Sequence, residues 1–123
     1  MRIFTSIHIV FFVGSRYAQT ILARFRLGHS ELNAYLFRID RAESPMCACG
    51  RNEEDNYHYF MERGLYESPR YTLMRKISNM LALNTRISLN LLLGGPDFRL
   101  TDELYERVAK ELVIFVKKTL RLH

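Results

Sequence analysis

The segment TDELYERVAKELVIFVKK, residues 101–118, carries the clearest structural pattern of the chain and decides its fold class. Its apolar residues recur every three or four positions, which is typical of an amphipathic helix that buries one face. Thr101 is placed to cap the amino end, where Asp102 and Glu103 complement the positive end of the helix dipole. We therefore predict a helix that runs on towards Arg121, with a buried stripe of Leu104, Val108, Leu112, Phe115 and Val116.

The chain between residue 16 and this segment also predicts helices, separated by short loops. Each candidate has apolar residues at helical spacing and is followed by a residue that commonly terminates helices, such as Gly28, Pro45 or Asn84. The assignment at 88–93 is ambiguous, because Ile87-Ser-Leu-Asn-Leu also alternates with a period of two. The predicted helices are residues 17–27, 30–39, about 53–62, 68–83 and 88–93.

These patterns predict a mainly α fold, a small single-domain helical bundle with an irregular Cys-x-Cys-Gly loop. The 123 residues include 48% hydrophobic positions, which suffices for one core without disulfides. The sequence has no internal repeat, low-complexity tract or long linker, so we expect the helices to pack as one unit. We expect this domain at residues 16–123, with a degenerate zinc knuckle at 44–66, after an apolar leader at 1–15.

Cys47-Ala-Cys49-Gly50, followed by His58, supplies the parts of a small zinc knuckle. Two thiols one residue apart, a glycine that allows a sharp turn and an imidazole after eight intervening residues are ligand types that zinc sites use. Structural zinc takes four protein ligands, but the position of a fourth ligand is held by Arg63, a permanent cation. The predicted metal ligands are therefore Cys47, Cys49 and His58, with zinc as the cofactor and the fourth ligand absent.

The two cysteines are the only ones in the chain, and one intervening residue is too short a spacing for a ready disulfide. They indicate metal binding in a reducing compartment, or alternatively two partly buried small apolar residues. A zinc site with an open position can support hydrolysis in principle. However, no motif places a nucleophile beside His29, and we expect no enzymatic activity.

Basic and acidic residues are segregated along a chain whose formal net charge is +5. Five arginines lie between residues 16 and 41 against two acids, whereas residues 43–67 hold six acids against two arginines. Arginines interleaved with aromatic residues suit phosphate contacts and base stacking in single-stranded nucleic acid. The alternative is a solvated helix face whose aromatic residues belong to the core. The interleaved aromatic residues are Tyr17, Phe25, Tyr35 and Phe37.

A series of short motifs between about residues 20 and 75 resembles one known arrangement. The series runs LARFRLGH (22–29), LNxYLxRI (32–39), SPxCxCG (44–50), Glu53-Glu54, His58-Tyr-Phe, Leu65-Tyr66 and Arg70. In order and spacing it is similar to the segment that follows the reverse transcriptase and RNase H regions of non-LTR, LINE-type or jockey-like retrotransposon polyproteins. That family has Cys-Pro where this chain has Arg63-Gly64.

The resemblance implies a retrotransposon-derived, non-catalytic nucleic-acid-binding module from a polyprotein whose activity is that of an RNA-directed DNA polymerase. The chain has neither the adjacent aspartates of a polymerase palm nor the ordered carboxylates of RNase H. We expect RNA or single-stranded DNA as the partner, no membrane and no small-molecule substrate, and the oligomeric state stays open. The residues expected to contact nucleic acid are Arg24, Arg26, His29, Arg38 and Arg41.

Residues 3–13 are mostly apolar, follow Arg2 and precede small residues, as in a secretory signal. The run is too short to span a bilayer, and His8 interrupts it. We therefore expect a leader left by truncation and an intracellular location, in the nucleus or cytoplasm. Two other classes stay open: a small secreted helical protein, if the leader acts as a signal, and a protein-interaction or structural helical domain that has lost metal and nucleic-acid binding, as Arg63 suggests.

Overall fold

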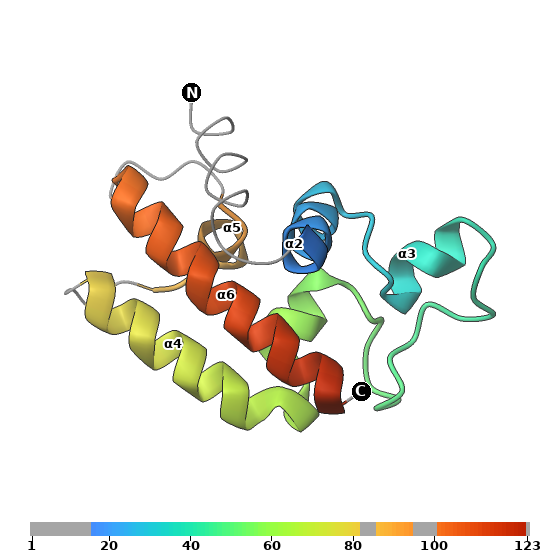
Figure 1. Cartoon of the computed structure of the whole chain (residues 1–123). Helices are drawn as coiled ribbons and strands as arrows, with labels where there is room; N and C mark the ends of the chain where they lie inside the picture. The colour runs from blue at the N-terminus through green and yellow to red at the C-terminus, as the bar shows by residue number, and fades with distance from the viewer. Residues whose placement is uncertain (1–15, 82–85, 95–100, 123) are drawn as a thin grey trace.

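The computed structural model describes residues 16–81, 86–94 and 101–122, and over these ranges the chain is helical and has no β-strand. The predicted mainly α fold is confirmed. The predicted leader and the predicted helix stop at Asn84 lie outside the described residues. In chain order the elements are α2 (Arg16–Leu27), α3 (Asn33–Arg38), the π-helix η1 (His58–Glu62), the 3-10 helix η2 (Gly64–Tyr66), α4 (Glu67–Leu81), α5 (Leu89–Leu92) and α6 (Asp102–Leu122) (Figure 1).

The long helix α6 lies beside α4 and forms the centre of the core, with further contacts to α2, α5 and η2 (Figure 1). Thr101 caps it as predicted, because its Oγ1 accepts the backbone N–H of Leu104 at 3.2 Å. Opposite α6, α4 buries Leu73 and Ile77. The predicted stripe faces this core, with Leu104 partly buried and the others buried: Val108, Leu112, Phe115 and Val116.

Five aromatic rings join α2, η1, η2 and α6. Their centroids are 4.8 to 6.4 Å apart, and most pairs meet edge to face, the arrangement that favours aromatic packing. The hydroxyl of Tyr59 also bonds to Thr119 on α6. Because η1 contributes two of these rings, the segment that carries His58 is fixed to the core. The five residues are Phe25, Tyr59, Phe60, Tyr66 and Phe115.

Helix α2 ends at the glycine that the sequence indicated. Gly28 has φ of +74°, a left-handed conformation that glycine adopts without steric cost. The N–H of Gly28 donates to the Phe25 carbonyl at 3.1 Å, and the N–H of His29 donates to the Arg24 carbonyl at 2.9 Å. This pair of bonds is the Schellman motif, and it turns the chain sharply from α2 towards α3.

Helix α3 is shorter than the predicted range 30–39 at both ends, and Ser30, the serine at the predicted start, does not cap it. Glu54 caps it from a distant part of the chain instead. Its Oε1 accepts the N–H of Asn33 at 2.9 Å, and its backbone carbonyl accepts the N–H of Ala34 at 3.1 Å. A carboxylate at this end also complements the helix dipole. None of the six residues of α3 is buried, so these bonds hold the helix in place of core packing.

The remaining predicted helices are present with small shifts. Helix α4 begins at Glu67, one residue before the predicted start, and α5 lies within the predicted range 88–93. The ambiguous segment is helical because Ser88 caps it, its Oγ accepting the N–H of Leu91 at 3.1 Å.

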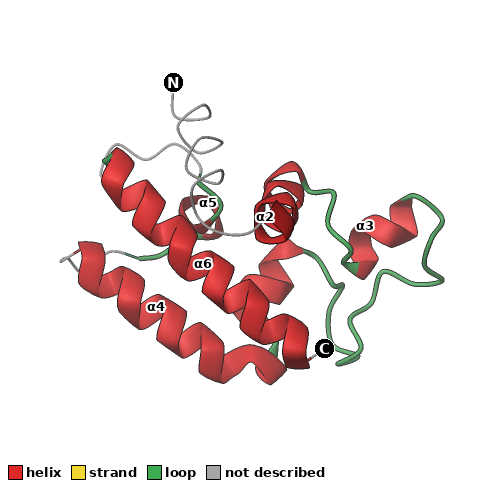
Figure 2. Ribbon diagram, in the orientation of Figure 1, coloured by secondary structure: helices red, strands yellow, loops and turns green. Residues whose placement is uncertain are grey.

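A long loop connects α3 to η1 at one end of the bundle (Figure 2). This end, with the loop, α3 and the end of α2, contains all the site residues that the sequence predicts. Among the described helices, none is long and apolar enough to cross a bilayer.

Candidate metal centre

The Cys-x-Cys-Gly loop is a tight turn closed by backbone hydrogen bonds. The N–H of Cys47 donates to the Asn52 carbonyl at 2.8 Å, and the N–H of Gly50 donates to the Cys47 carbonyl at 2.9 Å. Gly50 has φ of +79° with open space around it, so only the backbone conformation demands glycine there. The turn folds the Cys49 thiol back beside that of Cys47, and both lie close to His58.

His58 is placed by a capped helical turn. Asp55 Oδ1 accepts the N–H of His58 at 2.8 Å and caps a helical segment that begins at residue 56, so the helix predicted at about 53–62 starts later than expected, and Glu53 and Glu54 lie outside it. The segment closes as a π-helix through the bond from the N–H of Arg63 to the His58 carbonyl at 2.8 Å. Such wide turns often occur at functional sites.

The imidazole of His58 is oriented by Glu62. Nδ1 lies 3.2 Å from Glu62 Oε1, and Nε2 lies 3.3 Å from Cys49 Sγ. With the Nδ1 proton donated to the carboxylate, Nε2 presents its lone pair towards the thiols. A carboxylate on the outer ring nitrogen is the usual support of a metal-binding histidine, because it fixes the tautomer and raises the basicity of the ligand.

The Cys47, Cys49 and His58 ligand atoms all lie within 4.8 Å of one another, close enough to hold one metal ion. Zinc binds thiolate at about 2.3 Å and imidazole at about 2.0 Å, so two ligands of a tetrahedral ion are about 3.5 Å apart. The 3.3 Å separation of Cys49 Sγ and His58 Nε2 is close to that value. The donor set therefore fits zinc after small side-chain movements.

The two thiols differ in their surroundings. Cys47 is buried, and burial raises the pKa of its thiol. Cys49 is exposed, and a hydrogen bond from the backbone of Arg51 lowers the pKa of its thiol to about 7, with smaller contributions from Cys47 and the backbone of Asn52. Since the thiolate is the form that binds metal, Cys49 is the readier ligand at neutral pH.

Arg63, at the position of the missing ligand, is buried with an exposed fraction of 8%. Its Nη1 lies 3.7 Å from Glu54 Oε2 and donates to the Tyr66 hydroxyl at 2.9 Å. The guanidinium also lies 4.9 Å from the Tyr66 ring centre, within cation–π range. Arg63 thus joins the loop to the bundle by charge and hydrogen bonding, and among the described residues no fourth histidine, cysteine or carboxylate completes the cluster.

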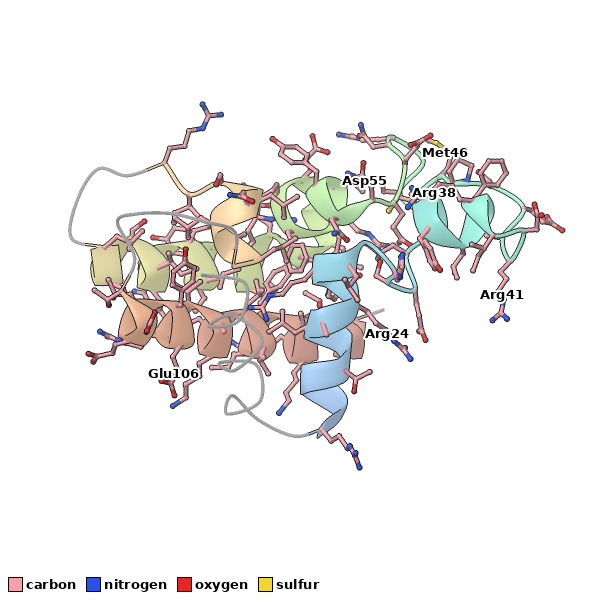
Figure 3. All side chains as sticks on the ribbon, turned by 90° about the horizontal axis from the view of Figure 1, so that it is seen from above. Arg24, Arg38, Arg41, Met46, Asp55 and Glu106 are labelled. Carbon is pink, nitrogen blue, oxygen red and sulfur yellow. The ribbon has the colours of Figure 1, made fainter. Side chains whose placement is uncertain are left out.

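Four of the five predicted nucleic-acid contacts are exposed, on the end of α2, in the turn after it, and on and after α3. Arg24 makes a long ion pair with Glu31, at 3.8 Å between exposed side chains. Figure 3 shows Arg24 and Arg41 pointing to the same side of the molecule. The Arg38 guanidinium lies 5.7 Å from the Tyr35 ring centre, and the His29 ring stacks on Tyr35 at 5.1 Å. We call the four exposed side chains the basic set: Arg24, His29, Arg38 and Arg41.

Arg26, the fifth predicted contact, has a different environment. Its side chain is half-buried, and Nε donates to the Leu93 carbonyl at 2.8 Å, at the carboxyl end of α5. Burial lowers the pKa of Arg26 to about 10. This arginine joins α2 to α5, and we therefore assign it to the fold and leave it out of the basic set.

Two residues that organise the centre, Glu62 and Glu54, are not among the predicted site residues. Glu62 follows His58 by four positions, so helical spacing alone could have indicated their contact. Glu54 caps α3 and meets Arg63 through the tertiary fold, and no local pattern indicates either contact.

No protein-family model, curated protein or solved structure matches this chain, so its function has to be argued from the residues of the centre and its surroundings.

Proposed function

We propose that the chain is a retrotransposon-derived, non-catalytic module that binds single-stranded RNA or DNA, and that zinc bound by Cys47, Cys49 and His58 orders its loop. The observation that carries the proposal is the exposure of the basic set on the end of α2 and on and after α3, a helix that hydrogen bonds join to the loop of the metal ligands. The motif series between residues 20 and 75 supports the same origin and function.

The metal half of the proposal rests on the orientation of His58. Glu62 holds Nδ1, so that Nε2 is directed to the thiols. Zinc bound there would neutralise the thiolates and tie the loop to η1. Cys47 is buried and the carboxylate of Glu62 holds the imidazole at Nδ1, so the ligands of a bound ion would be fixed in position.

Ordering the loop also orders the helix that carries Arg38. The side-chain amide of Asn33 donates to the Met46 carbonyl at 2.8 Å, next to Cys47, and Glu54 caps the same helix. Since α3 has no buried residue, its position depends on these bonds to the loop. Metal binding and placement of the basic set are therefore linked.

The nucleic-acid half rests on charge and exposure. Arg24, Arg38 and Arg41 are exposed, and the Arg24 ion pair is too long and too solvated to compete strongly with a phosphate. Arginine suits phosphate because its planar fork donates several hydrogen bonds. Three phosphate contacts to a single strand give a slope of about −2 for the logarithm of affinity against the logarithm of salt concentration.

A second candidate, a structural or protein-interaction domain without metal, is favoured by the ion pair of Arg63 with Glu54. That pair joins the loop to the bundle by means other than a fourth ligand. In that case the domain stays folded in chelator and binds no nucleic acid.

The test is a titration of the reduced, zinc-loaded protein with a fluorescent single-stranded RNA at several salt concentrations. We expect affinity to fall with salt at the slope given above and to fall further in the double variant Arg24→Ala/Arg41→Ala. Arg75→Ala is the matched control, because Arg75 is an exposed arginine on α4, away from the basic set. Absence of binding overturns nucleic-acid binding, an equal loss in the control overturns the assignment of the contacts to the basic set, and failure of the protein to take up zinc or cobalt overturns the metal site.

A further inference from the structure

A cleft of about 310 Å³ lies between α3, the turn before it and the start of η1. Its lining includes small and apolar residues, among them Gly28, Leu32 and Leu89, together with polar and aromatic side chains. The lining residues that the argument uses are Tyr35, Arg38, Asp55, Asn56 and Tyr57. In Figure 3, Asp55 lies by η1 and Arg38 by α3, and both line the cleft.

The cleft offers a flat aromatic surface for stacking. Tyr57 is 50% exposed, and across residues 16–81, 86–94 and 101–122 no other aromatic ring is in contact with it. Tyr35, by contrast, already carries the His29 ring and lies under the Arg38 guanidinium. A nucleobase stacks on any accessible aromatic face, so Tyr57 is the ring that a base would use.

The polar groups of the cleft are hydrogen-bond acceptors held in fixed positions. Asp55 Oδ1 accepts the N–H of His58, which leaves Oδ2 available. The Asn56 amide nitrogen donates to the Phe25 carbonyl at 2.8 Å, which leaves Asn56 Oδ1 available as an acceptor. A cleft that presents acceptors selects a ligand edge that presents donors.

Guanine is the base whose pairing edge has two adjacent donors, N1–H and the N2 amino group. Uracil has one donor on that edge, and adenine and cytosine have only their amino groups. The carboxylate of Asp55 would repel a phosphate in the cleft, whereas Arg38 at its side can bind the phosphate that follows the base. When the base stacks on Tyr57 and the following phosphate binds Arg38, the carboxylate of Asp55 meets hydrogen-bond donors and the guanidinium of Arg38 meets a negative charge.

We infer that this cleft binds one guanine base of the bound single strand, stacked on Tyr57 with its donor edge on Asp55 and Asn56. The inference rests on the proposed function and deepens it, because it supplies a sequence preference that phosphate contacts alone do not give.

The test compares two RNA strands of eleven nucleotides, both uridine except for a central guanosine in one and a central inosine in the other. Inosine lacks only the N2 amino group, so charge and stacking are matched. We expect the guanosine strand to bind roughly tenfold more tightly, since a hydrogen bond to a charged acceptor is lost with inosine.

Two variants locate the preference in the cleft. In Asp55→Asn the side-chain oxygen can still accept the N–H of His58, but the group facing the cleft becomes a donor, and the guanosine preference should disappear. Glu53→Gln removes an equal charge from an exposed residue outside the cleft lining and should leave the preference unchanged. Tyr57→Ala should weaken binding of the guanosine strand by roughly tenfold, whereas Tyr57→Phe should not.

The outcomes separate this inference from the proposed function. Equal binding of the two strands, with normal salt dependence and a normal loss in Arg24→Ala/Arg41→Ala, overturns the guanine site and leaves the nucleic-acid module intact. A guanosine preference that survives Asp55→Asn also overturns the site. Absence of binding to either strand overturns both proposals.

Discussion

The guanidinium of Arg63 lies 3.7 Å from the carboxylate of Glu54, and both side chains are almost fully buried. The same carboxylate caps α3, and the same guanidinium donates to the Tyr66 hydroxyl. The cation that replaces a metal ligand is therefore a structural connection between α3, the loop and the bundle. Removing one partner of a buried pair leaves an uncompensated charge, at a cost of about 3–5 kcal/mol.

Arg63→Cys should exchange this connection for a fourth zinc ligand. We expect the metal-free variant to be less stable than the parent by about 3 kcal/mol, because Glu54 loses its partner. With zinc, the thiolate can complete the tetrahedron, so zinc affinity should rise by at least roughly tenfold. Urea unfolding with and without zinc measures both effects.

Arg63→Ala is the matched control for this substitution. It removes the same cation and adds no ligand, so its stability should fall to a similar level, and zinc should stabilise it less than it stabilises Arg63→Cys. Equal zinc affinity of the alanine and cysteine variants would show that position 63 cannot reach the ion.

Glu62 should control metal affinity without controlling the fold. Its carboxylate orients His58, and its side chain is 42% exposed. Loss of such a supporting carboxylate typically weakens metal binding 10- to 100-fold. We expect Glu62→Ala to weaken cobalt binding by this range, measured by the thiolate-to-cobalt absorption band, with the unfolding transition unchanged.

Glu62→Gln tests what the carboxylate contributes. Glutamine keeps a hydrogen-bond acceptor for Nδ1 and removes the charge, so its cobalt affinity should lie between those of the parent and the alanine variant. An alanine variant with the affinity of the parent would mean that Glu62 is not a support of the metal ligand.

The parts of the fold that the sequence predicts are those whose signals are local. Thr101 and Gly28 each act on backbone groups within a few residues, and Ser88 caps the segment whose periodicity was ambiguous. Helix α3 differs because its cap, Glu54, lies 21 residues from Asn33. A local pattern cannot indicate a cap that only the tertiary fold supplies.

In the candidate site, too, only the local part could be predicted from the sequence. The spacing of Cys47, Cys49 and His58 was enough to indicate that they lie together, because a tight turn and one helical turn bring them close. The sequence treats Arg24 and Arg26 alike, although they lie on different sides of α2. Packing against α5 decides that Arg26 is half-buried while Arg24 is exposed.

Cys49 should be the more reactive thiol in metal-free protein. Its lowered pKa of about 7 means that the thiolate forms at a pH where an ordinary thiol is still protonated. Its alkylation by iodoacetamide should therefore rise with pH to a midpoint near pH 7, whereas Cys47 should react more slowly because it is buried and its pKa is raised. Fragment mass spectrometry of the alkylated peptide distinguishes the two sites.

Zinc should protect both thiols, and it should do so less well as pH falls. Protons compete with the ion for the thiolates, so affinity decreases as the pH drops through the pKa of Cys49. In the metal-free protein, an alkylation midpoint above pH 8 for Cys49 would contradict the lowering of its pKa by the hydrogen bond from the backbone of Arg51.

Alanine substitutions of Arg26 and Arg41 should have opposite effects, the first on stability and the second on nucleic-acid binding. Arg26→Ala removes the hydrogen bond from Nε to the Leu93 carbonyl, so we expect the free energy of unfolding to fall by about 1–3 kcal/mol. Arg41 is exposed, so Arg41→Ala should leave stability within about 0.5 kcal/mol of the parent. In RNA titrations the larger effect should come from Arg41→Ala, which should make the salt slope less steep by about 0.7, the value for one phosphate contact. Arg26→Ala should leave the slope unchanged when the variant is measured fully folded. A loss of slope in Arg26→Ala, with no loss of stability, would place its guanidinium on the nucleic acid and not on α5.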